Sequence, residues 1–200
     1  MRMTKITIRL LMLLLFTGYF SICAHAQSMT EEQVNTKKEN RFHFGFESEI
    51  MTWISGGYHG SIWFGRNGLR ARFVVASATY PQSFTPEGFK NLTSDFYEVE
   101  IDYFFGKKRK NFRGFWVALG PGYTQQTIES ETTGLKGSID LIDLHTGVGY
   151  AVNIFKGFYI NPWVGIDIHL NAPKEVNIGT EIWNPRIIDP VFGVKLGYSF

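Results

Sequence analysis

Two aspartates and two histidines recur with a spacing of two in the last third of the chain: Asp143 with His145, and Asp167 with His169. If their segments form neighbouring antiparallel strands around a turn centred near Phe155, Asp143 faces Asp167 and the histidines lie on the diagonals. Two carboxylates and two imidazoles suit a divalent metal ion. They also suit a hydrogen-bonded network in which histidines relieve the repulsion between carboxylates. We favour the network, so no metal and no other cofactor is predicted.

A second pattern has the residue types of nucleophilic catalysis. His59-Gly60-Ser61 places an imidazole two positions from a hydroxyl, and Glu47 and Glu49 supply carboxylates on the preceding segment. A histidine activates a serine hydroxyl when a third group orients it and when substrate can reach the serine. With a period of two, His59 and Ser61 share a strand face, so any reactivity depends on where that face points.

Both patterns lie in segments where apolar residues alternate with polar residues or glycine. This period of two indicates β-strands with two unlike faces, and no helical period of comparable length competes with it. Eight segments show the pattern: Arg41–Met51, Tyr58–Gly65, Leu69–Thr79, Phe96–Phe105, Phe115–Gln126, Asp140–Val152, Phe158–Leu170 and Pro190–Phe200.

One face of these strands is aromatic and uncharged, whereas the other carries charged residues, histidines and many glycines. Asn67-Gly68 tests the assignment, because this pair is the strongest short signal for a two-residue hairpin turn. Such a turn places Phe64 opposite Ala71, and both belong to the apolar face. The faces assigned on either side of the turn are therefore consistent.

Alternation alone does not decide which face points inward. Glycines on the charged face fit a narrow interior, where small side chains lie beside large ones. Uncharged apolar faces over segments of about 9–11 residues fit tilted strands that cross a bilayer. The sequence therefore predicts an all-β protein, an eight-stranded antiparallel up-and-down transmembrane β-barrel. Its first and last strands must pair, because lipid cannot satisfy an open sheet edge.

Charged side chains inside such a barrel must find partners, because burying an unpaired charge is costly. Strand parity brings two arginines of the third segment next to two acids of the fourth. At the seam between the first and last strands, Glu47 is predicted to pair with Lys195. The two arginines and two acids that strand parity brings together are Arg70, Arg72, Glu100 and Asp102.

The chain ends on an alternating strand made of Phe192, Val194, Leu196, Tyr198 and Phe200. Together with the eight segments, this strand resembles the small bacterial outer-membrane β-barrels of the OmpX and OmpA-transmembrane type. In those proteins the barrel-assembly machinery recognises the C-terminal aromatic strand. The resemblance therefore implies this machinery and outer-membrane lipid as partners, and it says little about activity.

The N-terminus has the pattern of a secretory signal peptide, with three basic residues, an apolar run and a small-x-small site ending at Ala26. Cleavage there removes the single cysteine, Cys23, and lowers the formal charge from +2 to −1, because no acidic residue leaves with the three basic ones. No nucleic-acid partner is predicted. Residues 1–26 are assigned to the signal peptide, 27–40 to a polar leader and 41–200 to the barrel.

These features predict a non-enzymatic outer-membrane protein with an interior filled by polar side chains. It would act structurally, or by binding and adhesion through extracellular loops. The loop between the last two strands holds more apolar residues than disordered loops usually do. Its possible binding residues are Ile182, Trp183 and Pro185. Packing of this loop on itself is the favoured alternative, and the extracellular partner stays unknown.

Two other classes stay open. The lipid A deacylase barrels use a His-x-Ser pair with a carboxylate on a lipid-facing surface. His59 and Ser61 match this spacing, but parity places them on the interior face. A soluble lipocalin-type ligand carrier is the other class. Gly114-Phe115-Trp116 is similar to the Gly-x-Trp element of that family, but it lies in the fifth segment and not in the first.

Overall fold

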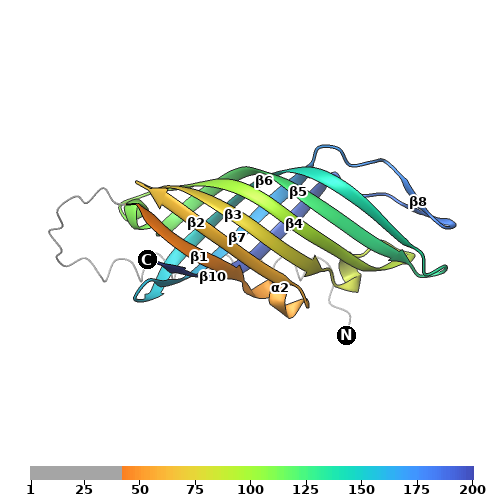
Figure 1. Ribbon diagram of the computed structural model, residues 1–200, viewed down its shortest axis with the longest axis horizontal. Helices are drawn as coiled ribbons and strands as arrows, with labels where there is room; N and C mark the ends of the chain where they lie inside the picture. The colour runs from red at the N-terminus through yellow and green to blue at the C-terminus, as the bar shows by residue number, and fades with distance from the viewer. Residues whose placement is uncertain (1–41) are drawn as a thin grey trace, which may run out of the picture. The chain divides into compact units, whose positions relative to one another are not determined.

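Residues 42–200 are described by a computed structural model, in which eight strands close into one antiparallel barrel (Figure 1). Each barrel strand pairs with the next one along the chain, and the last pairs with the first, which confirms the predicted fold. The predicted signal peptide and leader lie outside the described residues. The barrel strands are β1 (His43–Glu49), β2 (Tyr58–Arg66), β3 (Leu69–Thr79), β4 (Phe89–Phe104), β5 (Gly114–Ser130), β6 (Lys136–Phe155), β7 (Phe158–His169) and β10 (Ile188–Ser199).

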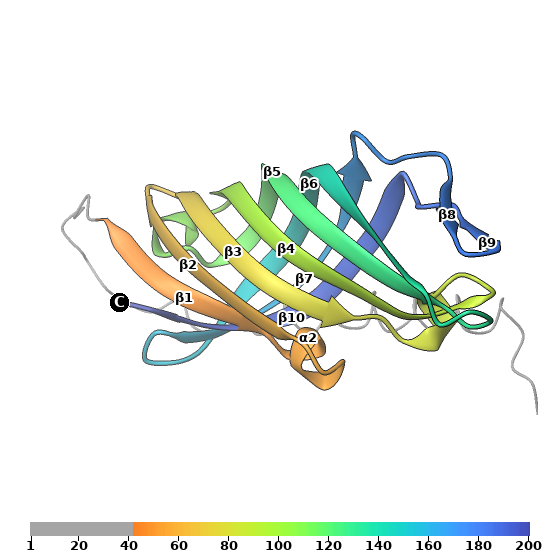
Figure 2. The same ribbon diagram turned by 45° about the vertical axis from the view of Figure 1, so that its right-hand side comes forward.

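The two ends of the barrel carry different connections. We call one the turn end, because it holds the β2–β3, β4–β5 and β6–β7 connections, with the 3₁₀ turn η2 (Arg109–Asn111) in the second of them. The opposite, loop end holds α2 (Ile50–Ile54), the β3–β4 connection with η1 (Gln82–Phe84) and the β5–β6 connection. A small hairpin of β8 (Val176–Ile178) and β9 (Glu181–Trp183) also lies there (Figure 2).

The apolar face of the strands points outward, as predicted. Ile62 on the outside is 66% exposed, whereas Arg70 and Arg72 on the other face are 0% exposed. This arrangement is the reverse of a soluble barrel, in which the apolar face forms the core and charges remain in water. The polar residues of the sequence patterns therefore lie inside the barrel.

The register of the β2–β3 hairpin is the predicted one. Asn67 and Gly68 have positive φ angles of 57° and 88°, as a two-residue type I′ turn requires. Phe64 pairs with Ala71, so both lie on the outer face.

The register of the seam between β1 and β10 was predicted wrongly by two residues. Glu47 pairs with Gly197, and Lys195 pairs with Glu49 in place of Glu47. No turn connects these two strands, so no turn length limits the registers that the sequence allows.

A disulfide across the seam tests this register. Phe46 and Tyr198 are directly paired and point outward. We expect the double variant Phe46→Cys/Tyr198→Cys to crosslink on mild oxidation, because directly paired strand positions lie within the span of a disulfide. The matched control is Phe44→Cys/Tyr198→Cys, which is diagonal in the structure. Non-reducing electrophoresis compares the two yields, and a higher yield for the control would contradict the observed seam.

Strand lengths differ from the sequence prediction at the loop end. β4 begins at Phe89, seven residues before the predicted start at Phe96. The short helix α2 replaces the end of the first predicted strand, so β1 stops at Glu49. The first part of β10, before Lys195, pairs with β7 alone, and α2 packs beside β10.

Within residues 42–200, no helix has the length and hydropathy that a membrane-crossing helix needs.

Candidate functional site

A network of five buried charged residues crosses the barrel interior. Arg70 Nε donates to Asp102 Oδ2 at 2.5 Å, and Arg72 Nη2 donates to Glu100 Oε2 at 2.6 Å and to Asp102 Oδ1 at 2.9 Å. Glu47 bridges the two arginines, accepting from Arg70 Nη1 at 2.9 Å and from Arg72 Nη1 at 3.2 Å. The structure thus brings the four expected residues together and adds Glu47 to them.

Lys195 lies apart from this network. Its Nζ is 4.2 Å from the ring centroid of Trp163, and Trp163 Nε1 donates to Glu49 Oε1 at 3.0 Å. Glu47 makes its ion pairs with arginines and none with Lys195 among the residues described, so the predicted Glu47–Lys195 pair is wrong. The shifted seam explains the error, because it sets Lys195 opposite Glu49.

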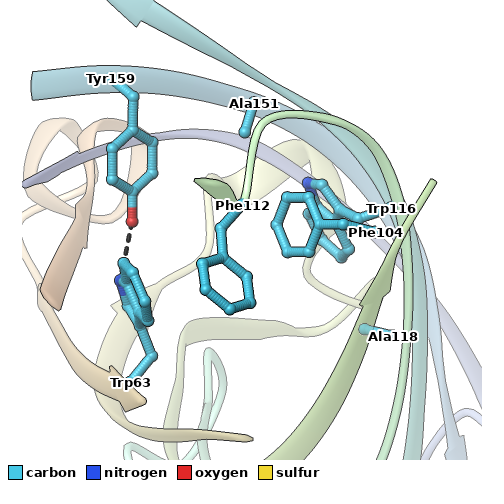
Figure 3. Close-up of a cluster of buried hydrophobic side chains, with 7 residues drawn as sticks. All are labelled: Trp63, Phe104, Phe112, Trp116, Ala118, Ala151 and Tyr159. Carbon is cyan, nitrogen blue, oxygen red and sulfur yellow. Dashed lines mark hydrogen bonds between the residues drawn. The ribbon is translucent and has the colours of Figure 1, made fainter. Parts of the chain in front are cut away.

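Aromatic side chains close the interior at the turn end. The β4–β5 connection inserts Phe112, with a φ of 55°, among the side chains of the barrel wall. Trp63 Nε1 donates to the Tyr159 hydroxyl at 2.8 Å, and that hydroxyl donates to Glu47 Oε1 at 2.8 Å. The cluster is therefore linked to the charged network. Figure 3 shows its members, which are Trp63, Phe104, Phe112, Trp116, Ala118, Ala151 and Tyr159.

The four metal candidates from the sequence form two pairs in place of one set. The β6–β7 register is shifted by two from the predicted one, so Asp143 faces His169 and His145 faces Asp167. His145 Nδ1 and Asp167 Oδ1 are 2.6 Å apart. His169 Nδ1 makes a short hydrogen bond with Asp143, and its Nε2 lies 3.1 Å from Asp189 Oδ2.

A cavity of about 260 Å³ occupies the loop half of the interior. Apolar residues of β3, β4 and β10 form much of its wall, and residues of α2 and of the β3–β4 connection surround its mouth. This half of the interior thus holds a cavity as well as side chains. The acidic, basic and histidine residues that line the cavity are Glu49, His59, Glu98, His145, Asp167 and Lys195.

The β7–β10 connection packs on the loop end of the barrel. Trp183 and Ile178 are buried in an apolar cluster with residues of β4, β5 and β6. Pro185 is buried too, whereas Ile182 is 53% exposed. Of the three predicted loop-binding residues, Ile182 alone is accessible to a partner.

His59 and Ser61 do not form a nucleophile and its base. Both are buried inside the barrel. Ser61 Oγ donates to the backbone oxygen of Glu47 at 3.4 Å, and His59 Nδ1 has no hydrogen-bond partner within the described chain. The pair therefore lies on the interior face of the barrel, unlike the lipid-facing pair of the deacylase barrels.

One residue that the sequence interpretation missed is Arg113. Its guanidinium lies 4.1 Å from the ring centroid of Tyr159 and donates to Asn153 Oδ1, the Gly157 carbonyl and Ser199 Oγ at 2.8–3.2 Å. It thereby ties two connections and the C-terminus together at the turn end. Nothing in the sequence indicated this role. Arg113 follows the basic run of residues 107–110, which has the composition of a solvated turn.

No protein-family model and no curated protein matches the sequence. Among solved structures, the fold is similar to a major outer membrane protein from Thermus thermophilus, at 13% identity and a TM-score of 0.50, over 80% of this chain and 98% of that one. It is also similar to Neisserial surface protein A, at 11% identity and a TM-score of 0.46, over 80% of this chain and 97% of that one. The chain therefore has the fold of the small outer-membrane β-barrels, as the sequence resemblance predicted.

Proposed function

We propose that this chain is an integral protein of the bacterial outer membrane, without catalytic activity, that binds a ligand or partner at its loop end. The observation that carries the proposal is the belt of apolar side chains around the barrel, from Phe44 and Ile62 on the first two strands to Phe192 and Leu196 on the last. Soluble monomers rarely expose apolar surface of this extent. A lipid bilayer would cover it, as it covers the outward bands of transmembrane barrels.

The interior supports the binding of a ligand and not the passage of solutes through the barrel. The aromatic cluster closes the turn end, and the five-residue ion-pair network lies beside it. Eight-stranded barrels have an interior only wide enough for side chains or one small ligand. A continuous aqueous pore is therefore not part of the proposal.

The loop end offers the binding surface. The cavity has its mouth beside α2, where Trp53 and Ile54 are exposed. The packed β7–β10 connection gives this end a defined shape, with Ile182 accessible on it. In the proposed orientation the turn end faces the periplasm and the loop end faces outward, where extracellular partners would meet it.

Export and assembly complete the proposal. Cleavage after Ala26 would release the mature chain, and the last strand would serve as the signal for the barrel-assembly machinery. Phe200 also has a structural contact at the seam. Its backbone N–H donates to the Phe44 carbonyl at 2.9 Å, and its ring stacks on that of Phe44 with centroids 4.8 Å apart.

Expression of the full chain in a Gram-negative host tests these proposals. We expect a barrel with heat-modifiable migration that resists carbonate extraction, begins at Gln27 and gives no conductance steps in planar bilayers. A chain ending at Ser199 should give less folded barrel, because it loses the contacts with Phe44. Phe73→Ala is the control, since this outward-facing aromatic lies on β3, away from both the seam and the last strand. Carbonate extraction of the intact protein, or stepwise conductance, would contradict the proposed function.

A further inference from the structure

We propose that Glu98 and His145, with Asp167 positioning the histidine, bind a divalent transition-metal ion at the wall of the interior cavity. Each residue offers one ligand atom, and these three atoms lie within 4.8 Å of one another. They come from β4, β6 and β7, and all three line the cavity. This site goes beyond the proposed function and does not depend on the membrane in which the barrel resides.

Two of the three side chains have polar atoms that no hydrogen bond within residues 42–200 uses, although His145 Nε2 lies 3.7 Å from Glu100 Oε2. His145 is 2% exposed, and its Nε2 has no hydrogen-bond partner within residues 42–200. In the same part of the chain, the Glu98 carboxylate has no hydrogen bond and no ion pair, although the network residue Glu100 is two positions away on the same face. Buried polar atoms in native structures normally have partners, and the exceptions need an explanation. A ligand in the cavity would provide one.

Asp167 places His145 in the orientation that metal ligation requires. Its Oδ1 is 2.6 Å from His145 Nδ1. When Nδ1–H donates to a carboxylate, the opposite nitrogen presents its lone pair, and this arrangement is the usual one behind metal-binding histidines. Because Asp167 lies on the Nδ1 side of the ring, it positions His145 for an ion at Nε2, and Glu98 supplies the carboxylate ligand. The unpartnered Nε2 is therefore chemically suited to a cation.

Glycines on the intervening strand give these side chains room to meet. β5 separates β4 from β6, and it places Gly122 between Glu98 and Asp143. A Cβ at Gly122 would lie 3.1 Å from Glu98 Cγ. A Cβ at Gly120 would lie 2.0 Å from the Val99 carbonyl oxygen. Larger residues at these positions would crowd the space across which β4 and β6 place their ligands.

The charges around the cavity favour a cation. Asp143 has His169 as its partner, and Glu49 pairs in the ladder with Lys195. Glu98 and Asp167 share one histidine, His145. When both carboxylates are ionised, this group is negative even if the imidazole is protonated. Buried carboxylates are costly unless they are paired or coordinate metal ions. A divalent ion would neutralise this group.

The donor set selects the class of ion. An imidazole together with a carboxylate suits first-row divalent transition metals such as Zn²⁺, Co²⁺ and Mn²⁺. Ca²⁺ and Mg²⁺ prefer all-oxygen sites. The cavity leaves space for water molecules to complete the coordination shell.

Cobalt binding to the intact barrel tests the site. Full-length protein, purified as a heat-modifiable barrel in detergent, is stripped with EDTA and titrated with Co²⁺ by visible absorption. We expect one Co²⁺ per barrel, displaced by Zn²⁺ and not by equimolar Ca²⁺. Wild-type barrel that binds no Co²⁺ at this stoichiometry, or releases it to Ca²⁺, would overturn the proposal.

Two conservative variants locate the site, and one control keeps the test specific. Glu98→Gln and Asp167→Asn should each weaken Co²⁺ binding at least about tenfold, the lower end of what altered metal-site residues cost. His59→Gln should leave the affinity unchanged, because His59 lines the same cavity but lies outside the cluster. Heat-modifiable migration shows that each variant is folded. Equal affinity in wild type and Glu98→Gln would assign the binding elsewhere and refute the site.

Discussion

Replacing Arg72 with alanine is expected to lower the free energy of unfolding by roughly 3–5 kcal/mol, the range for breaking a buried ion pair. The guanidinium contacts Glu47, Glu100 and Asp102. Without it, the one ion-pair contact left to Glu100 within residues 42–200 is His145, whose Nε2 is 3.7 Å from Glu100 Oε2. The loss therefore comes mainly from acids left buried without their cation. Urea unfolding in detergent or lipid measures it.

A second substitution and a surface control make this test specific. Adding Glu100→Gln to Arg72→Ala removes one orphaned charge and should recover part of the loss, whereas Asp102 still has Arg70 as a partner. The control is Lys90→Ala, which breaks a 3.1 Å ion pair between an exposed lysine and Glu129. It should cost about 0–1 kcal/mol. A loss for Arg72→Ala no larger than that of the control would contradict the inward placement of the charged face.

Adding a single methyl group at Gly45 is expected to disrupt the seam. The Cβ of Gly45→Ala would lie 2.2 Å from the backbone oxygen of Tyr198 and 2.6 Å from the ring of Trp63. The oxygen belongs to the facing strand, so relief requires β1 and β10 to separate. Overpacking of this kind costs about 1–3 kcal/mol. We expect a lower free energy of unfolding in urea. When the change is combined with Phe46→Cys/Tyr198→Cys, we expect a lower yield of the disulfide.

Gly60 provides the matched control for this change. It lies on the neighbouring strand β2, points outward, and a Cβ there would meet no atom within 4 Å. Gly60→Ala should therefore be neutral or slightly stabilising, since alanine restricts the unfolded chain more than glycine does. If both alanine variants behave alike, steric closure at the seam is not what Gly45 provides.

Face assignment was the part of the structure that sequence predicted best. A period of two fixes which residues share a face, whatever the register, and it placed Arg70 and Arg72 beside Glu100 and Asp102. The β2–β3 register was also predictable, because Asn67-Gly68 permits a single turn geometry. Local rules of this kind need no knowledge of the rest of the fold.

Registers without a defining turn were not predictable. The β6–β7 pairing has an irregularity between Asn153 and Phe155, and a change of two in register keeps every side chain on its face. Hydrophobic patterning therefore could not distinguish an Asp143–Asp167 pair from the observed aspartate–histidine pairs. The same ambiguity explains why the sequence predicted Lys195 opposite Glu47, whereas the structure pairs it with Glu49.

The candidate metal site required side-chain positions. Glu98 is one of several acids on the polar face, and nothing in its spacing connects it with His145 and Asp167. These residues belong to three strands, and the contact depends on the two glycines of β5 and on a register that the sequence leaves open. Helix α2 was missed for a similar reason, since tertiary packing decides where the first strand ends.

Closure through β1 and β10 also has a consequence for how the barrel folds. Every other ladder joins strands that follow one another along the chain, whereas Gly45 meets Ser199 only after about 150 intervening positions. Hairpins can thus form locally, but the sheet cannot close until β10 has been synthesised. Bringing ends this far apart together costs about 4 kcal/mol in chain entropy beyond the constant term. Closure is therefore a late step with high contact order, and Phe200 reaches Phe44 only when the ring of strands is complete.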